Sequence, residues 1–249
     1  KVGNIVGIAG GRGEKTGKLE FSYATDARRQ PGSSFKPLST YGPAMDQGVI
    51  VPSSTVYDKA LSTDDNGRPW PMNDGKMPTG RAMSVESGIA SSVNTIAVQV
   101  LNALTPQKSF DFLTQRLGFA DSLVSSRTEA DGRVSTDIAL APLALGGLTD
   151  GVTVRDMAGG FATFINEGVY GGTRTYTQVT DSEGNVVLEN TPSTDLGFEN
   201  VRTAYYMLDC LQNVTAYGTA SGTQISGVET AGKTGTTTSN TDIWFCGVT

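Results

Sequence analysis

The sequence contains no histidine, and this absence excludes several kinds of catalytic site at once. A Ser-His-Asp triad, a histidine general base and a histidine-bearing zinc site all require a residue type that the chain lacks. The two cysteines, Cys210 and Cys246, are too few for a thiolate metal cage, and their spacing leaves open whether they pair. Buried thiols acting as small apolar side chains are the simpler interpretation. Any acid–base chemistry in this chain must therefore use another side chain, and we expect no cofactor or metal.

Basic clusters and long apolar runs are also missing. The formal net charge is −6, from 19 basic and 25 acidic residues, and Arg28 and Arg29 form only a pair. Nucleic-acid binders gather Lys and Arg to neutralise phosphates, so this composition argues against a nucleic-acid partner. No run of about 18 apolar residues occurs that could cross a bilayer as a helix. Neither a signal peptide nor an initiator methionine precedes Lys1, so we expect any anchor to lie upstream of a trimmed chain.

Strand patterns are concentrated toward the two ends of the chain, and helical patterns lie mostly between them. Strands are expected at 2–9, 19–24, 228–237 and 242–248, with a hairpin of 173–180 and 185–189 around the turn 181–184. Helices are expected from 33 onward, at 83–104, 107–117, 154–165 and 201–214, and irregular loops at 51–77. No repeat or low-complexity linker divides the chain. The patterns predict an α+β fold in which an antiparallel sheet, built from both chain ends, flanks an inserted and mainly helical half.

Two apolar stripes in the expected helices are interpreted as core-facing. One comprises Phe110, Leu113 and Leu117, and the other comprises Val154, Met157, Ala158, Phe161 and Ile165. Both repeat at the spacing of one helix face, which a globular domain usually buries.

The first candidate for chemistry is the S-x-x-K sequence of Ser33 and Lys36. On a helix, this spacing places the hydroxyl and the amine one turn apart on the same face. Lysine can act as a base when burial or a neighbouring positive charge lowers its pKa. The spacing by itself also fits an ordinary surface helix and arises readily by chance.

Two further polar segments offer partners for that pair. Ser92-Val93-Asn94 would place a hydroxyl and a carboxamide on one side of an extended segment, although a polar turn is the better explanation of the tripeptide taken alone. Ser92 could relay a proton to a leaving amine, and Asn94 could bond both a substrate amide and the lysine.

Lys233-Thr234-Gly235-Thr236 lies in an expected strand, where the amine and the two hydroxyls could hold a substrate carboxylate. Gly235 would allow a close backbone approach, and a peptide could then add to the sheet edge. The N–H groups of Ser33 and Thr236 are the natural pair for an oxyanion hole.

The stretch GVETAGKT, ending at Thr234, also fits the pattern of a nucleotide phosphate loop. Such a loop requires a helix that begins at the Lys-Thr pair. Here Gly235 and three consecutive threonines oppose a helix, and DIWFCGV follows as a strand. The nucleotide interpretation is therefore set aside.

The order S-x-x-K, S-x-N, K-T-G is the established signature of penicillin-binding proteins and class A β-lactamases. Across nearly its whole length the chain resembles the transpeptidase domain of class A, bifunctional penicillin-binding proteins. The segments that carry this resemblance are RRQPGSSFKP, GRAMSVESGIASSVNTIAVQVL, LGGLTDGVTVRDMAGGFATFINEGVY and AGKTGTTTSNTDIWFCGVT.

The resemblance implies a fold and roles for particular residues. The fold would be that of penicillin-binding proteins and serine β-lactamases, with residues 1–249 as one catalytic domain. Its sheet half would span about 1–30 and 170–249, and its helical half about 31–169. Ser33 would be acylated by the penultimate D-alanine of a stem peptide, with Lys36 as base and Ser92 and Asn94 assisting. Substrate-binding residues would be Lys233, Thr234, Gly235, Thr236, Trp70 and Asn73, the last two in PWPMND, which a rigid turn explains equally well.

The resemblance also implies a setting outside the chain. Peptidoglycan stem peptides and β-lactam antibiotics would be the partners, at the extracytoplasmic face of a bacterial membrane. A membrane anchor and a glycosyltransferase domain would lie upstream, and the family usually adds a strand and a closing helix after WFCGVT. We therefore expect the chain to be truncated at its C-terminus.

Three rivals use the same residues. A class A β-lactamase needs an E-x-x-L-N loop to activate water, and none occurs between Asn94 and Lys233. A DD-carboxypeptidase would pass the acyl group to water instead of to an amine. A non-catalytic β-lactam sensor would be acylated without turning over peptide.

Overall fold

The computed structural model describes residues 3–14, 17–18, 20–237 and 240–249. The helical elements are the 3-10 helix η1 (Gly32–Phe35), the π-helix η2 (Pro37–Tyr41), α1 (Gly42–Asp46), α2 (Val85–Ala90), α3 (Asn94–Leu104), α4 (Pro106–Arg116), α5 (Leu140–Leu145), α6 (Val154–Ile165), α7 (Val201–Ala216) and the 3-10 helix η3 (Ser221–Thr223). The strands pair antiparallel as β1 (Thr55–Tyr57) with β4 (Ala82–Ser84), β2 (Ser62–Thr63) with β3 (Pro69–Trp70), β5 (Arg127–Thr128) with β6 (Val134–Ser135), β7 (Gln178–Thr180) with β8 (Val186–Glu189), and β9 (Ala231–Thr236) with β10 (Ile243–Val248).

A continuous helical segment from Gly32 to Asp46 runs through the middle of the molecule. Phe35, Leu38 and Tyr41 on this segment are fully buried, and η1 and η2 contact α3, α4, α5 and β9. Burying one large apolar side chain contributes about 1.5–3 kcal/mol, so this segment is fixed by the core on several sides. The helical character expected from Ser33 onward is confirmed, but as successive 3-10, π and α turns.

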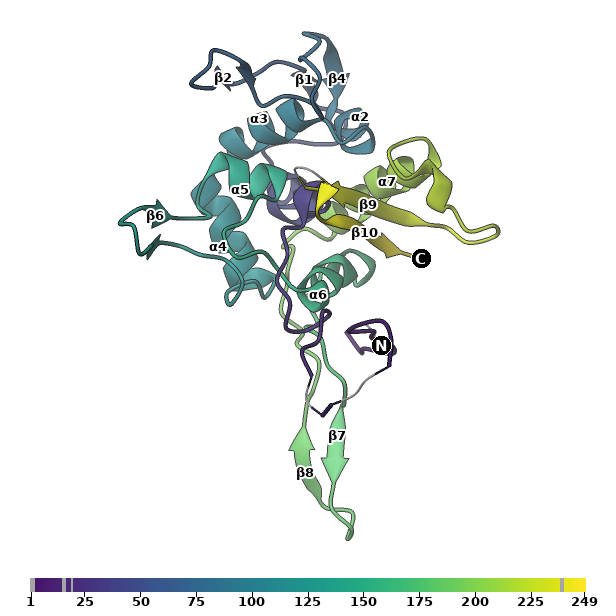
Figure 1. Cartoon of the computed structure of the whole chain (residues 1–249). Helices are drawn as coiled ribbons and strands as arrows, with labels where there is room; N and C mark the ends of the chain where they lie inside the picture. The colour runs from purple at the N-terminus through teal and green to yellow at the C-terminus, as the bar shows by residue number, and fades with distance from the viewer. Residues whose placement is uncertain (1–2, 15–16, 19, 238–239) are drawn as a thin grey trace.

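The hairpin of β9 and β10 lies across this central segment (Figure 1). Lys233 is opposite Cys246 in its register, and α7 covers β9 from the helical side. The strands expected at 228–237 and 242–248 are confirmed over 231–236 and 243–248. Because Lys233 and Thr234 lie in a strand instead of at a helix start, the phosphate-loop geometry is excluded.

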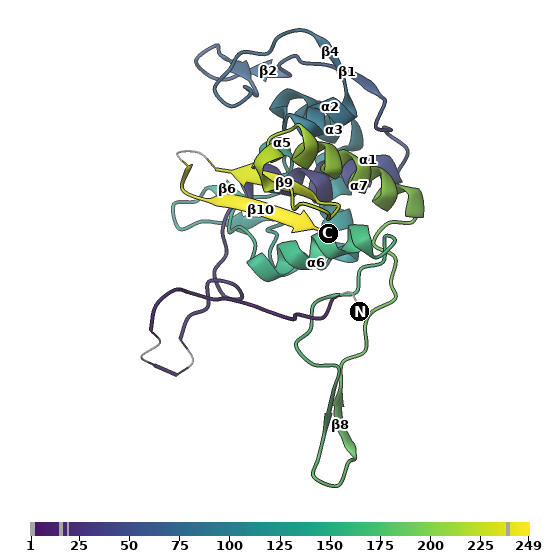
Figure 2. The same cartoon turned by 90° about the vertical axis from the view of Figure 1, so that its right-hand side faces the viewer.

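Helix α6 begins with a capping box, in which Thr153 and Asp156 bond each other's backbone N–H groups. Its bounds match the expected helix, and Met157 and Phe161 are buried as predicted. The prediction is wrong for Val154, Ala158 and Ile165, which are exposed. Figure 2 shows α6 beside β10. Val154, Ala158 and Ile165 line an open groove of about 420 Å³ between these two elements, so they face the groove instead of the core.

The helices expected at 107–117 and 201–214 are confirmed as α4 and α7, and Phe110, Leu113 and Leu117 are buried. The expected hairpin of 173–180 and 185–189 is confirmed for β7 and β8, which project away from the helical body (Figure 1). The helical character expected at 83–104 is confirmed as two helices, α2 and α3, with a turn of the chain between them. The irregular loop expected at 51–77 contains the short strands β1, β2 and β3.

The N-terminal strands expected at 2–9 and 19–24 are not formed in the described residues of those ranges; Val2 and Leu19 lie outside the described residues. Val6 is fully exposed, and Phe21 is 61% exposed, so neither segment buries an apolar face. The glycines between residues 3 and 13 also weaken extended structure. The expected sheet from both chain ends is therefore wrong in this detail. The N-terminal contribution reduces to an isolated parallel bridge between Asn4 and Arg174.

Candidate active site

Ser33 lies in the first turn of the central helical segment, where β9 meets it. Gly32 before it has φ +54°, and a Cβ there would lie 2.6 Å from the Thr236 carbonyl oxygen. Residues i and i+3 eclipse in a 3-10 helix, and the Lys36 N–H donates to the Ser33 carbonyl oxygen. Ser33 and Lys36 therefore share one face, as their spacing predicts.

The adjacent hydroxyl of Ser34 points elsewhere. Ser34 is fully buried, and its Oγ donates to the Pro31 carbonyl oxygen at 2.7 Å. Ser33 is half-buried, and its Oγ has no hydrogen-bond partner among the residues that the structure describes. Of the two serines in SSFK, Ser33 alone keeps its hydroxyl free for a substrate.

Lys36 is fully buried beneath this hydroxyl-bearing turn. Its Nζ donates to the Ser92 carbonyl oxygen at 2.9 Å and to Asn94 Oδ1 at 2.7 Å. Burial, and then the positive charge of Lys233, lower the pKa of Lys36 well below its usual value. The site thus favours the neutral amine that a general base requires.

Ser92 and Asn94 reach the site from the turn between α2 and α3. Ser92 has φ +56°, a left-handed conformation that costs a non-glycine residue about 1–3 kcal/mol and that clusters at functional sites. Asn94 is the first residue of α3, and its Nδ2 donates to the Met72 carbonyl oxygen at 2.9 Å. The two side chains converge because of this tight turn, and not because they alternate along an extended segment as the sequence suggested.

Lys233 approaches Ser92 from the β9 side. It is fully buried, and its Nζ donates to Ser92 Oγ at 2.8 Å and to the Thr234 carbonyl oxygen at 3.2 Å. Burial lowers the pKa of Lys233 to about 7. Ser92 therefore bridges two lysines, with its carbonyl oxygen on Lys36 and its hydroxyl on Lys233. Such a hydroxyl can pass a proton between groups on the two sides of the site.

The threonines of this strand lie toward the surface. The hydroxyls of Thr234 and Thr219 are 2.7 Å apart, and Thr236 is exposed at the end of β9. The sequence did not indicate a role for Thr219, because no spacing pattern connects it to Thr234.

Gly235 serves a contact within the protein. A Cβ at this position would lie 2.2 Å from the Pro31 carbonyl oxygen and 2.8 Å from the Ser34 backbone nitrogen. The close approach expected at this glycine is therefore made by the chain's own segment that leads into Ser33.

Gly235→Ala is expected to destabilise the protein by about 3 kcal/mol, the upper end for overpacking, because the obstructing atoms belong to the backbone. The free energy of unfolding in urea measures this. Gly222→Ala is the matched control, since a Cβ there meets nothing within 4 Å, and it should change stability by less than about 0.5 kcal/mol. Equal denaturation midpoints for the two variants would contradict this assignment.

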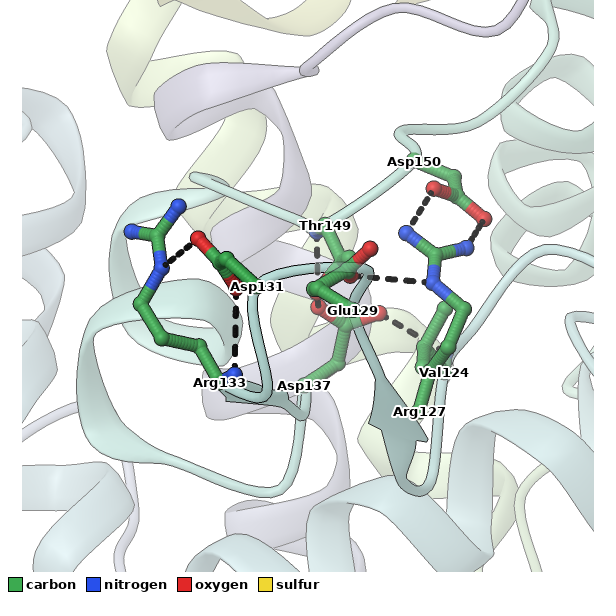
Figure 3. Close-up of polar contacts among 8 residues, drawn as sticks. All are labelled: Val124, Arg127, Glu129, Asp131, Arg133, Asp137, Thr149 and Asp150. Atoms are coloured by element: carbon green, nitrogen blue, oxygen red, sulfur yellow. Dashed lines mark hydrogen bonds and ion pairs between the residues drawn. The ribbon is translucent and has the colours of Figure 1, made fainter.

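The opposite side of the Ser33 segment is braced by residues 146–152. Arg29 and Val152 exchange two backbone hydrogen bonds of 2.9 Å, and a Cβ at Gly146 would lie 2.1 Å from the Gly32 carbonyl oxygen. Asp137 holds this loop by accepting from the Thr149 N–H and hydroxyl and from the Val124 N–H (Figure 3). Figure 3 also shows that two nitrogens of the Arg127 guanidinium donate to the two carboxylate oxygens of Asp150. These hydrogen bonds are 2.8 and 2.9 Å long.

Of the two residues expected in the cleft from PWPMND, Asn73 contacts Asn94. Trp70 is half-buried and packs against the hydrophobic core. Asn73 Oδ1 accepts from the backbone N–H groups of Asn94 at 3.0 Å and Thr95 at 3.2 Å, while its Nδ2 donates to Asp58 at 2.7 Å. The structure thus brings Ser33, Lys36, Ser92, Asn94 and Lys233 together and places Asn73 behind them. Asp58 carried no signal in the sequence.

Other kinds of site find no support in the described part of the chain. Cys210 and Cys246 are both free, and no group of three potential metal-binding side chains occurs among the described residues. None of the described helices is long and apolar enough to cross a membrane. The chemistry available here is that of a free serine hydroxyl, two buried lysines and a bridging serine.

Comparisons with known proteins identify the family of the chain. The family model of the penicillin-binding protein transpeptidase domain matches residues 1–249. Penicillin-binding protein 4 of Bacillus subtilis is 32% identical over 246 residues, covering 98% of this chain and 36% of that protein. Penicillin-binding protein 1A of Clostridium acetobutylicum is 32% identical over 256 residues, covering 99% and 30%. The chain spans about a third of the length of these relatives.

Solved structures confirm the fold. Penicillin-binding protein 1A from Haemophilus influenzae has a TM-score of 0.72 and 24% identity, with 92% of this chain and 38% of that one covered. The D,D-transpeptidase domain of a peptidoglycan glycosyltransferase from Eggerthella lenta has a TM-score of 0.68 and 20% identity, with 91% and 58% covered. A penicillin-binding protein fold around a serine and two buried lysines defines the class. The chain belongs to the penicillin-binding protein transpeptidase domain family.

Proposed function

We propose that residues 1–249 form a single catalytic domain that cross-links peptidoglycan stem peptides as a serine DD-transpeptidase and is inhibited by β-lactams. The observation that carries this proposal is the pair of buried lysines that bond Ser92 from two sides, with Lys36 on the same face as the free Ser33 hydroxyl. Membership of the family supports it.

In the first half-reaction, the Oγ of Ser33 attacks the carbonyl carbon of the penultimate D-alanine, and Lys36 takes the hydroxyl proton of Ser33. The N–H groups of Ser33 and Thr236 would stabilise the tetrahedral oxyanion, and the contact between Gly32 and Thr236 keeps these segments together. When the peptide bond breaks, the proton taken up by Lys36 passes through the Ser92 hydroxyl to the leaving amine, D-alanine departs, and Lys36 is neutral again. The stem peptide remains as an ester on Ser33.

Recognition of the donor peptide would use its terminal carboxylate. The buried Lys233 would supply the cation, and the hydroxyls of Thr234 and Thr236, further along β9 toward the surface, would supply donors. Asn94 Nδ2 donates to Met72 and its Oδ1 accepts from Lys36, so Asn94 acts mainly by holding the base.

In the second half-reaction, an amine from a neighbouring stem peptide attacks the ester. The amine loses its proton to the base, a new amide forms, and Ser33 regains its hydroxyl. By analogy with class A relatives, the full-length protein would carry a glycosyltransferase domain and a membrane anchor and act at the extracytoplasmic face of the cell membrane.

Acylation by labelled benzylpenicillin tests the chemistry. We expect a one-to-one adduct in the intact mass, which peptide mapping places on Ser33. A D-Ala-D-Ala peptide supplied with an acceptor amine should then yield D-alanine and the amide product. Hydrolysed peptide alone would favour a carboxypeptidase, an adduct with no D-alanine release would favour a β-lactam sensor, and absence of any adduct under native conditions would overturn the proposal.

A further inference from the structure

A buried carboxylate, Asp58, lies behind the candidate active site and has no role assigned so far. It is 2% exposed and follows β1 directly. Oδ1 accepts from Asn73 Nδ2 at 2.7 Å and from the Thr95 hydroxyl at 2.6 Å. Oδ2 accepts from the N–H and the hydroxyl of Thr79, both at 2.8 Å. Among the described residues no cation pairs with Asp58, so uncharged donors alone hold it.

The direction of these bonds fixes the orientation of Asn73. An ionised carboxylate only accepts hydrogen bonds, so Asn73 must turn its Nδ2 toward Asp58 and its Oδ1 toward α3. That oxygen accepts the first N–H groups of α3, from Asn94 and Thr95. The N-cap residue Val93 has no side-chain oxygen for these donors, so Asn73 caps the helix in its place.

Fixing the start of α3 fixes the partner of the base. Asn94 is the first residue of that helix, and its Oδ1 accepts from Lys36 Nζ at 2.7 Å. Three hydrogen bonds therefore connect Asp58 to Lys36, through Asn73 and Asn94. We infer that Asp58 is a positioning residue, which holds Lys36 for the acylation of Ser33 by locking Asn73 as the cap of α3. This inference rests on the proposed function.

Charge and burial agree with this role. Burial alone would raise the pKa of Asp58, but the bonds from Thr95, Thr79 and Asn73 together lower it, so the carboxylate is ionised at neutral pH. The negative charge also lies at the N-terminus of α3, where the helix dipole stabilises it.

Asp58→Asn preserves the shape of the side chain but replaces one accepting oxygen with a donating NH2 group. Each oxygen of Asp58 receives two donors, so the new amide nitrogen must face N–H or O–H groups on one side. If that nitrogen faces Asn73, the Asn73 carboxamide must flip, which turns its own nitrogen toward the N–H groups of α3 and removes the cap.

The expected result is a loss of about 10- to 100-fold in the maximal rate constant for benzylpenicillin acylation, the usual scale for a displaced catalytic group. The pH profile distinguishes positioning from a general loss of stability. Asn94 Oδ1 stabilises the charged form of Lys36, so weakening this bond lowers the pKa of Lys36. The acid limb of the profile should therefore move to lower pH, by about one unit. Among the described residues, the charged group that affects the pKa of Lys36 is Lys233 on β9. The thiol of Cys246 on β10 affects the pKa of Lys233.

Asp137→Asn is the matched control. Asp137 is also fully buried and also accepts from the N–H and hydroxyl of one threonine, Thr149 (Figure 3). Among the described residues, its side chain accepts from Thr149 and Val124 and has no hydrogen bond to Asn73 or Asn94. It should lower the melting temperature comparably and leave the midpoint of the acid limb unchanged.

Asn73→Ala is the second variant, and it keeps the test decisive if Asp58→Asn does not fold. It should show the same downward shift of the acid limb, and the double variant should be no slower than the slower single one, because both act through one link. Unchanged midpoints in Asp58→Asn and Asn73→Ala, or additive rate losses, would overturn the inference while wild-type acylation still stood. Lack of acylation in the wild type would instead overturn the proposed function.

Discussion

Ser33→Ala is expected to abolish the covalent adduct with benzylpenicillin and the release of D-alanine. The Ser33 hydroxyl is the nucleophile in the proposed mechanism, and a methyl group cannot form the ester. Because Ser33 Oγ has no hydrogen-bond partner among the described residues, its removal should change the free energy of unfolding by less than about 0.5 kcal/mol. Intact mass after incubation with antibiotic, together with a urea denaturation curve, measures both expectations.

Ser34→Ala is the matched control, one residue along the same 3-10 helix. Ser34 loses its bond to the Pro31 carbonyl oxygen, which costs about 1 kcal/mol, yet the adduct should form. An adduct that persists in Ser33→Ala, or disappears only in Ser34→Ala, would show that the nucleophile has been placed on the wrong residue.

Short-range spacing predicted the parts of the site that lie within a single segment. Ser33 and Lys36 share a face because any helix brings residues three apart together. The β9 location of Lys233 followed from β-branched and glycine-rich sequence next to a second strand. Neither pattern alone could establish that the segments meet, and only the family resemblance brought them into one cleft.

Features that depend on partners far apart in the chain could not be predicted from the sequence. Asp58 lies in the segment 51–77 that its Pro and Gly content marked as a loop, and its partners Asn73 and Thr95 are 15 and 37 positions away. A polar turn was one interpretation of Ser92-Val93-Asn94, but the left-handed backbone of Ser92, which favours glycine, could not be predicted from a serine.

Apolar patterns predicted the helix bounds correctly but did not predict which residues of each apolar stripe are buried. In α6 the periodicity identified the apolar stripe, yet periodicity reports which residues share a face and not what covers that face. The groove beside β10 leaves Val154 and Ile165 about half exposed. The N-terminal strands were wrong for a related reason, because Val6 and Phe21 have β propensity but no buried surface to pack against.

Lys36→Met is expected to slow benzylpenicillin acylation by about 10²- to 10⁴-fold, the usual contribution of a positioned general base. Methionine nearly matches the apolar stem of lysine and removes the amine. Its effect on stability should be modest, since the unpaired Ser92 carbonyl and Asn94 Oδ1 cost about 1–3 kcal/mol each, whereas replacing a buried polar amine with an apolar group offsets part of this cost. Stopped-flow acylation kinetics and thermal unfolding measure the two effects.

The pH dependence of the acylation rate, compared between the wild type and Lys36→Met, identifies the base. Burial and the charge of Lys233 lower the pKa of Lys36, so the neutral amine is available far below the usual range of lysine. As pH falls through the pKa of Lys36, the wild-type rate should decline about tenfold per unit, because protonation removes the base. Lys36→Met should lose that limb, whereas the exposed control Lys108→Met should retain both the limb and the wild-type rate. An acid limb that survives unchanged in Lys36→Met would assign the base to another group, of which Lys233, with its pKa lowered to about 7, is the nearest candidate.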